Sequence, residues 1–258
     1  MKKLRIFMGI IAFSMVAYST PTWMWVGTYA IDNYTGNGGG AGNLNWSIAD
    51  ALCFAFAADM YCDLTRYYVN LTDADVTHVS FSNNGTRELC DFVYYQGHGS
   101  YGEVFLGGGT NYGSITPSDM VHGTSYNRWV EYSSCLTLIY RDDLFSYWSP
   151  AFSGVQTILG YASITYGLND EKASLLHDEF WERWAWWGDG MWTAHAQSVF
   201  HVLYAQGGLD VAPAVISGYY LDGDNYVPLS SRNYTETTSD AGTSPYCWAQ
   251  CICGDPNY

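Results

Sequence analysis

The sequence is poor in positive charge. Only 10 Lys and Arg residues stand against 25 Asp and Glu residues among 258 positions, which gives a formal net charge of −15. A surface of this sign repels the phosphate backbone of nucleic acids. The balance therefore excludes DNA and RNA as expected partners.

Long hydrophobic runs are also absent. The apolar run Ile6–Val16 is too short to cross a bilayer. It follows the basic segment Met1–Arg5 and precedes the small residues of Ala17–Ser19, a pattern typical of a secretory signal. We predict that residues 1–19 are removed on export, the alternative being a retained anchor. Removal of Lys2, Lys3 and Arg5 makes the charge −15 − 3 = −18, and we expect a secreted or cell-surface protein without a membrane span.

Several motifs of cofactor and hydrolase chemistry are missing. The glycine-rich stretch Gly36–Asn43 lacks the Lys-Ser/Thr ending of a phosphate loop and the spacing of a dinucleotide fingerprint. The sequence has no Gly-x-Ser-x-Gly elbow and no His-Glu-x-x-His pair. His177, His195 and His201 are therefore interpreted as core or surface residues. We predict no cofactor and no metal site.

Segments with strand and helix patterns alternate along the chain. The patterns predict strands at 25–31, 76–81, 91–96, 129–133, 157–163 and 212–220, and helices at 48–62, 170–187 and 192–205. This alternation predicts an α/β domain with a mostly parallel sheet and helices on both faces. In such a sheet, ligands bind beyond the carboxyl ends of the strands.

Two of these strands end in residues that can do chemistry. The aromatic strand that begins at Asp91 closes in Gly97-His98-Gly99-Ser100, and the strand that begins at Arg128 closes in Ser133-Ser134-Cys135. Glycine beside an ionisable residue permits sharp turns and close approach to a ligand. If the two strands are neighbours, His98 can take the proton of the Cys135 thiol and activate the sulfur.

These strand ends resemble those of the caspase-like cysteine peptidases, which include caspases, legumain, clostripain and gingipains. The resemblance rests on His98-Gly99 and Ser134-Cys135, and is greatest to a prokaryotic branch with a YY-x-GHG-S strand end, matched here by Tyr94–Ser100. It implies a caspase-like three-layer sandwich at residues 20–225, followed by a Cys-rich tail at 226–258 that packs on the domain.

The resemblance also implies a reaction. A peptide or protein substrate would be cleaved by a dyad of His98 and Cys135, with the oxyanion held by the backbone N–H groups of Gly99 and Cys135. Asp32, at the end of the first predicted strand, takes a position that shapes the substrate pocket in similar enzymes. An acidic pocket would favour Arg or Lys, whereas the alternative is a surface turn residue. The polar segment before Cys135, which includes Glu131, departs from the more aliphatic pattern of the family.

The chain contains seven cysteines, and export permits disulfides. With Cys135 as the nucleophile, six remain as disulfide candidates: Cys53, Cys62, Cys90, Cys247, Cys251 and Cys253. The last three are close enough in sequence to suggest metal ligation, but no zinc-type Cys/His pair accompanies them, and a disulfide-held tail is favoured. Cys53 and Cys62 fall on opposite faces of one predicted helix and so need other partners.

Asn-x-Ser/Thr sequences provide candidate glycosylation sites at Asn33, Asn45, Asn70, Asn84 and Asn233. Aromatic residues make up 17% of the chain, enough to supply adhesive surfaces. The alternative function is therefore a non-catalytic extracellular glycoprotein of the same fold that self-assembles as a homo-oligomer, surface layer or filament.

Overall fold

The computed structural model describes residues 24–34, 42–62, 66–78, 89–106, 113–120, 127–152, 155–165, 167–205, 211–222, 225–228, 230 and 247–250. Its centre is a seven-stranded sheet with the strand order β12-β9-β8-β7-β3-β1-β2 within these residues. The strands are β1 (Trp25–Ala30), β2 (Arg66–Thr72), β3 (Phe92–Gln96), β7 (Trp129–Ser133), β8 (Thr157–Tyr161), β9 (Pro213–Ser217) and β12 (Cys247–Gln250).

The sheet is mostly parallel. β2, β1, β3, β7 and β8 run in one direction, whereas β9 is antiparallel to both β8 and β12. The central strands β3, β7, β8 and β9 are buried along their whole length. Strands covered on both faces have near-continuous runs of apolar and aromatic residues, which is what these four sequences mostly show. The predicted α/β class is confirmed.

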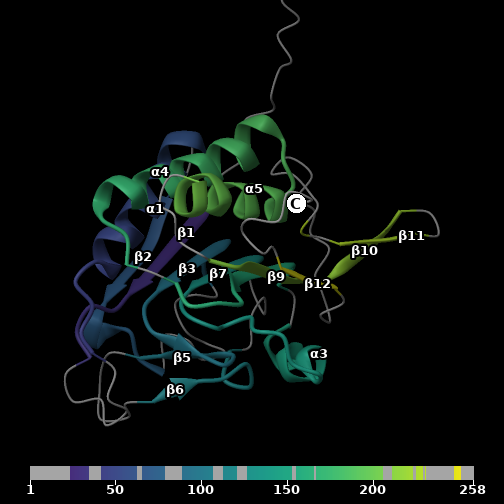
Figure 1. Cartoon of the computed structure of the whole chain (residues 1–258), viewed down its shortest axis with the longest axis horizontal. Helices are drawn as coiled ribbons and strands as arrows, with labels where there is room; N and C mark the ends of the chain where they lie inside the picture. Colours follow the sequence, from purple (N-terminus) through teal and green to yellow (C-terminus); the bar gives the residue numbers. More distant parts are fainter. Residues whose placement is uncertain are drawn as a thin grey trace, which may run out of the picture.

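Helices α1 (Ser47–Tyr61), α4 (Asp170–Trp181) and α5 (Met191–Ser198) cover one face of the sheet (Figure 1). α4 and α5 continue into π-helical turns, η4 (Glu182–Trp187) and η5 (Val199–Ala205). Asn169 caps α4 by accepting the Lys172 N–H, and Gly188 ends η4 in a left-handed conformation at φ 77°. The core between sheet and helices is aromatic, with Phe54, Phe92 and Trp181 in one buried cluster.

The opposite face is covered by smaller elements. These are a three-stranded sheet of β4 (Gly99–Ser100), β5 (Glu103–Phe105) and β6 (Ser114–Ile115), the helix α3 (Leu144–Trp148) and the 3₁₀ turn η3 (Ser149–Ala151). Figure 1 places α3, β5 and β6 on the side away from α1 and α4. The molecule thus has three layers, with α3 as an α-helix on this face.

Two elements differ from the sequence-based expectation. β2 was not predicted, and the predicted strand at 76–81 is not formed at residues 76–78, while 79–81 lie outside the described residues. The chain leaves β2 through the 3₁₀ turn η1 (Asp73–Asp75), where Asp73 has φ 47°. The Asp73 carboxylate accepts the N–H groups of Asp32 and Asn33, each at 2.8 Å. This left-handed turn ends the extended chain before Val76.

The C-terminal segments extend the domain. β10 (Tyr219–Asp222) and β11 (Asn225–Pro228) form an antiparallel hairpin, and β12 adds a strand beside β9. No helix among the described residues is long and apolar enough to cross a membrane.

Candidate active site

The two strands with His98 and Cys135 after their ends are parallel neighbours. β3 and β7 pair residue for residue from Phe92 opposite Trp129 to Gln96 opposite Ser133. Both strands therefore end at the same level, and the turns that follow them meet at the carboxyl edge of the sheet. This is the edge at which open α/β sheets bind ligands. The neighbouring parallel strands are as the sequence predicted.

The turns are held together by a contact that only glycine permits. A Cβ atom on Gly99 would lie 2.8 Å from the Glu103 carbonyl oxygen and 2.8 Å from Ser134 Oγ. Both distances are shorter than normal van der Waals contact. The residue after His98 therefore packs directly against the residue before Cys135.

The His98 imidazole is oriented by the loop that follows β1. Its Nε2 lies 2.8 Å from the carbonyl oxygen of Gly42. Because a carbonyl oxygen can only accept, Nε2 carries the proton, and in a neutral ring Nδ1 then keeps its lone pair. The backbone N–H of His98 donates to the Tyr34 hydroxyl at 2.7 Å. The contact with Gly42 thus leaves Nδ1 as the acceptor atom of a neutral His98 ring.

Tyr34 links the histidine turn to the loop after β1. Its N–H donates to Asn43 Oδ1, and its ring lies 4.8 Å from the His98 ring between centroids. Burial raises the pKa of Tyr34 to about 12, so the hydroxyl stays protonated. A Cβ on Gly97 would lie 2.5 Å from the Tyr34 hydroxyl oxygen. Glycine before His98 therefore makes room for this tyrosine.

Cys135 lies on a tight turn. Leu136, the next residue, adopts the left-handed conformation at φ 55°, which is unfavourable for a residue with a branched side chain. Its N–H donates to the Ser163 carbonyl, and Thr137 Oγ1 donates to the Ser134 carbonyl at 2.8 Å. The backbone N–H of Cys135 donates no hydrogen bond within the described residues.

The two candidate dyad residues have separate partners. The Cys135 sulfur contacts Thr165, whose N–H donates to it at 3.3 Å. No hydrogen bond joins the Cys135 thiol to His98 in the described part of the chain. Both side chains are partly exposed at one edge of the sheet. Proton transfer between them stays a prediction.

Asp32 has a structural role in the same loop. Its Oδ1 accepts the N–H of Ser47, the first residue of α1, at 2.7 Å, and its carbonyl accepts the Leu44 N–H. A carboxylate at a helix N-terminus satisfies an unpaired N–H and is favoured by the helix dipole. Asp32 thus fixes the loop that contains Gly42, and its use in substrate binding stays a prediction.

The structure describes the side chains of three of the six disulfide candidates and that of Cys135. Cys53, Cys62, Cys90 and Cys135 form no disulfide in this structure. Cys62 is buried among the helices and Cys90 on the other side of the sheet, so the sheet separates their sulfurs. Burial, with the charges of three aspartates, raises the pKa of Cys53 to about 11. Cys251, Cys253 and the Cys247 side chain lie outside the described residues.

Three of the sequons lie on the surface. Asn33 and Asn45 are exposed on either side of the Gly42 loop, and Asn70 is exposed on the edge strand β2. Asn84 and Asn233 lie outside the described residues. Their glycosylation stays a prediction.

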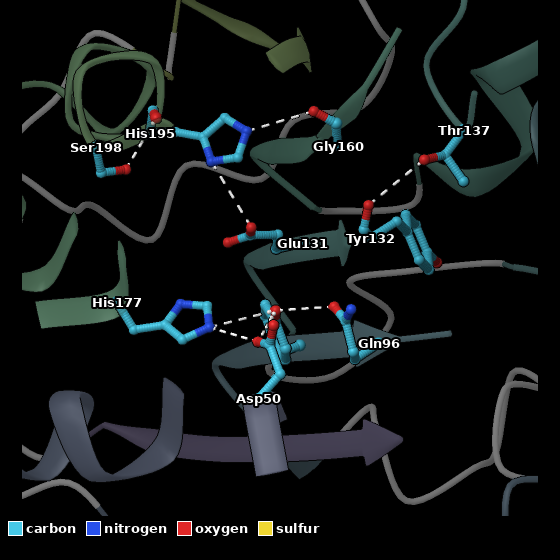
Figure 2. A network of polar contacts seen from close by, with 10 residues as sticks. Asp50, Gln96, Glu131, Tyr132, Thr137, Gly160, His177, His195 and Ser198 are labelled. Carbon is cyan, nitrogen blue, oxygen red and sulfur yellow. Dashed lines mark hydrogen bonds and ion pairs between the residues drawn. The ribbon is translucent and has the colours of Figure 1, made fainter. Parts of the chain in front are cut away.

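A buried polar network that the sequence did not predict lies beneath the site, between the sheet and the helices (Figure 2). His177 Nε2 lies 2.6 Å from Asp50 Oδ1, and the Tyr94 hydroxyl lies 2.8 Å from the same oxygen. Beside them, His195 Nδ1 lies 3.7 Å from Glu131 Oε1, and His195 Nε2 lies 3.3 Å from the Gly160 carbonyl. His177 and His195 are core residues, as the sequence indicated.

Glu131 and His195 are both in their neutral forms at neutral pH. Burial, followed by the nearby charge of Asp50, raises the pKa of Glu131 to about 8. Burial lowers the pKa of His195 to about 4, against the effect of its bond to Gly160. Since Nε2 donates to the Gly160 carbonyl, Nδ1 presents a lone pair to the protonated Glu131 carboxyl. At neutral pH the pair is uncharged, which suits a dry interior.

Sequence reasoning missed Tyr34, Gly42 and Thr165, all of which contact the candidate dyad. Their positions in loops carry no periodic signal. Glu131 did carry a signal, because a carboxylate inside a buried aromatic strand requires a partner. That partner, His195, lies 64 positions later (195 − 131) on another element.

A family model described as "Domain of unknown function (DUF6345)" matches residues 28–200. The chain belongs to the DUF6345 family. The match runs from β1 to the end of α5 and into η5, and includes both His98 and Cys135. Comparison with curated proteins gave no match.

Two solved structures are similar to this DUF6345 chain in shape. One is the Arg-specific cysteine proteinase gingipain R (RGPB), with 16% identity and a TM-score of 0.45, covering 70% of this chain and 42% of that chain. The other is caspase-1 from Spodoptera frugiperda, with 8% identity and a TM-score of 0.45, covering 91% of this chain and 87% of that chain. This chain therefore spans less than half of the gingipain chain.

We predict that Gly99→Ala separates the two strand ends. The added Cβ would force Ser134 and the Glu103 carbonyl apart, at a cost of about 1–3 kcal/mol of folding free energy. We expect a lower thermal unfolding temperature and a lower rate of Cys135 alkylation in this variant than in the wild type. Gly113→Ala is the matched control, because a Cβ there meets nothing within 4 Å. Equal behaviour of the two variants would contradict the contact.

We predict that the free energy of unfolding falls as pH rises from about 6.5 to about 8, and that Glu131 causes this fall. Its carboxyl keeps its proton in the folded protein up to a pKa of about 8 but loses it near 4.5 when unfolded, so stability falls as pH rises between these values. His195 has the opposite slope between its ordinary pKa of 6.5 and about 4, which leaves a net fall above about pH 6.5.

Glu131→Gln tests this dependence, because glutamine has the shape of a protonated glutamate and does not ionise. Melting temperatures of both proteins should be compared between about pH 6.5 and pH 8. The variant should lose most of the alkaline slope. A slope as steep as that of the wild type would show that another group causes it.

Proposed function

We propose that this DUF6345 domain is a cysteine peptidase, with Cys135 as nucleophile and His98 as general acid and base. The observation that carries the proposal is the exact register of β3 and β7, which brings both turns to one edge with Gly99 packed against Ser134. The resemblance of the His98-Gly99 and Ser134-Cys135 strand ends to caspase-like peptidases supports the same roles.

The first half of the reaction would form a thioester. His98 Nδ1 takes the thiol proton, and the Cys135 sulfur attacks the carbonyl carbon of a peptide bond. The backbone N–H of Cys135, which has no described partner, and that of Gly99 would hold the oxyanion. The imidazolium then gives its proton to the departing amine as the carbon–nitrogen bond breaks.

The second half would release the acyl group. A water molecule gives one proton to Nδ1 of His98 and attacks the thioester carbon. The carbon–sulfur bond breaks, the carboxylic acid leaves, and the proton returns to the thiolate sulfur. The Gly42 carbonyl supports both halves, because it accepts from Nε2 and stabilises the imidazolium.

The proposal includes the setting of the enzyme. We propose export of the mature chain after removal of residues 1–19, which is supported by the basic and apolar pattern of its start. The substrate would be a peptide or protein. The strongly acidic composition supports a preference for cationic segments and disfavours nucleic acid.

An exposed apolar stripe favours self-assembly as a second candidate function. Leu52, Phe56 and Met60, spaced four residues apart on α1, face solvent, and the Phe56 side chain is 64% exposed. Trp186 and Trp187 on η4 are also exposed, and Trp186 contacts Tyr61 at the end of α1. Contiguous apolar patches of this kind favour contact between copies of a chain.

We predict that Cys135→Ala and His98→Gln each lower peptide hydrolysis by on the order of a thousandfold or more. Alanine removes the nucleophile, and glutamine retains a donor for the Gly42 carbonyl without a basic nitrogen. Cleavage of a broad peptide library by the secreted protein measures the effect. His78→Gln is the matched control, since His78 is exposed and pairs with Asp119 instead.

The same variants distinguish the two candidate functions. If the protein functions by self-assembly, wild type and Cys135→Ala should assemble alike. Sedimentation measures this assembly. Intact wild-type protein that cleaves no library peptide and reacts with no electrophilic peptide probe would overturn the enzyme and favour assembly.

We predict that Asp32→Asn weakens the preference for Arg or Lys before the scissile bond by about tenfold. Asparagine retains an oxygen for the Ser47 N–H and removes only the charge, so the Gly42 loop stays in place. The ratio of kcat/KM for basic and apolar peptides is the readout. An unchanged ratio would leave Asp32 with its structural role alone.

A further inference from the structure

Thr165 contacts the Cys135 sulfur with three atoms. Its N–H donates to Sγ at 3.3 Å, its hydroxyl oxygen lies 3.6 Å away, and its carbonyl oxygen lies 3.7 Å away in position to accept from the thiol. One residue thus provides an acceptor for the S–H group and two donors for the sulfur. A thiol needs the acceptor, and a thiolate needs the donors.

The segment that leads to Thr165 is bonded to two neighbouring parts of the chain. The Ser163 carbonyl accepts the Leu136 N–H at 2.9 Å, which joins this segment to the Cys135 turn. Ser163 Oγ accepts the Ala212 N–H at 2.8 Å, and the Ala162 N–H donates to the Ala212 carbonyl, which joins it to the start of β9. The segment after β8 therefore holds Thr165 over Cys135 through bonds that do not involve the thiol.

We propose that Thr165 is a positioning residue that holds the Cys135 sulfur and stabilises its thiolate form. This inference rests on the proposed function, in which the thiolate is the nucleophile. In the resting site, the thiol proton points to the Thr165 carbonyl, and the Thr165 N–H donates to the sulfur. The segment that follows β8 and includes Thr165 thus contributes to the site, in addition to the turns that follow β3 and β7.

The hydroxyl supplies the change that ionisation requires. When the thiol proton moves to His98 Nδ1, the sulfur gains a negative charge and loses its S–H donor. The Thr165 hydroxyl then rotates so that its hydrogen points to the sulfur, while the backbone N–H continues to donate. Hydrogen bonds to an ionised group are about twice as strong as those between neutral groups. No covalent bond of Thr165 is made or broken, and the proton that leaves Cys135 is the proton that His98 gains.

The test compares Thr165→Val with Thr165→Ser. Valine has nearly the same shape but no hydroxyl, whereas serine retains the hydroxyl and loses only the methyl group. The folded full-length proteins are alkylated with iodoacetamide from acid to alkaline pH, and labelling of Cys135 is followed by peptide mass spectrometry. Cys53 serves as an internal control in every sample, because its raised pKa keeps its thiol protonated at neutral pH.

We expect Thr165→Val to lower Cys135 labelling at neutral pH roughly tenfold and to move the midpoint of its pH profile to higher pH. Thr165→Ser should label within about twofold of the wild type, with an unmoved midpoint. A purely structural role would affect both variants similarly and would also expose Cys53. Wild-type labelling in Thr165→Val, or equal losses in both variants, would overturn the inference.

The outcomes separate this inference from the proposed function, because alkylation requires no peptide turnover. A wild type that labels as expected but cleaves no peptide would refute the peptidase and retain the role of Thr165. A wild type that cleaves peptides, with labelling unchanged in Thr165→Val, would refute the role of Thr165 alone.

Discussion

The in-register parallel pairing of β3 with β7 is the constraint on which the candidate site depends. It brings the ends of two strands, separated by 32 residues of chain between Gln96 and Trp129, to the same level of one edge. The contact of Gly99 with Ser134 then sets how closely the two turns approach. A register shift of one residue would turn every side chain of β7 to the opposite face.

The aromatic core excludes water, whereas the polar network within it contains groups that can carry charge. Phe54, Phe92 and Trp181 exclude water from the space between sheet and helices, and this raises the cost of any charge there. Glu131 lies in that space on the strand that ends before Cys135, and it persists as a neutral acid beside the neutral His195 ring. The Glu131–His195 pair therefore places polar groups between the sheet and the helices without adding a charge at neutral pH.

Sequence patterns predicted the elements whose residues are buried on both faces. The bounds of β7 agree with the prediction at both ends, and β1, β3, β8 and the helices agree to within a few residues at most boundaries. β2 was missed because an edge strand has a weaker hydrophobic pattern, and the strand predicted at 76–81 is not formed at residues 76–78, which follow the left-handed turn at Asp73. The sequence likewise did not indicate that Cys62 and Cys90 lie on opposite faces of the sheet. Sequence spacing does not report that a sheet separates two sulfurs.

The sequence by itself determined the α/β class and the strands that precede His98 and Cys135, because apolar periodicity and glycine placement are local properties of the chain. Only the tertiary structure decided which groups surround these two residues. Tyr34 and Gly42 reach His98 from the loop after β1, and Thr165 reaches Cys135 from the segment after β8. Such contacts join positions 30 to 64 residues apart in the sequence. They leave no periodic trace in the sequence, since one polar atom at the right place suffices to form each of them.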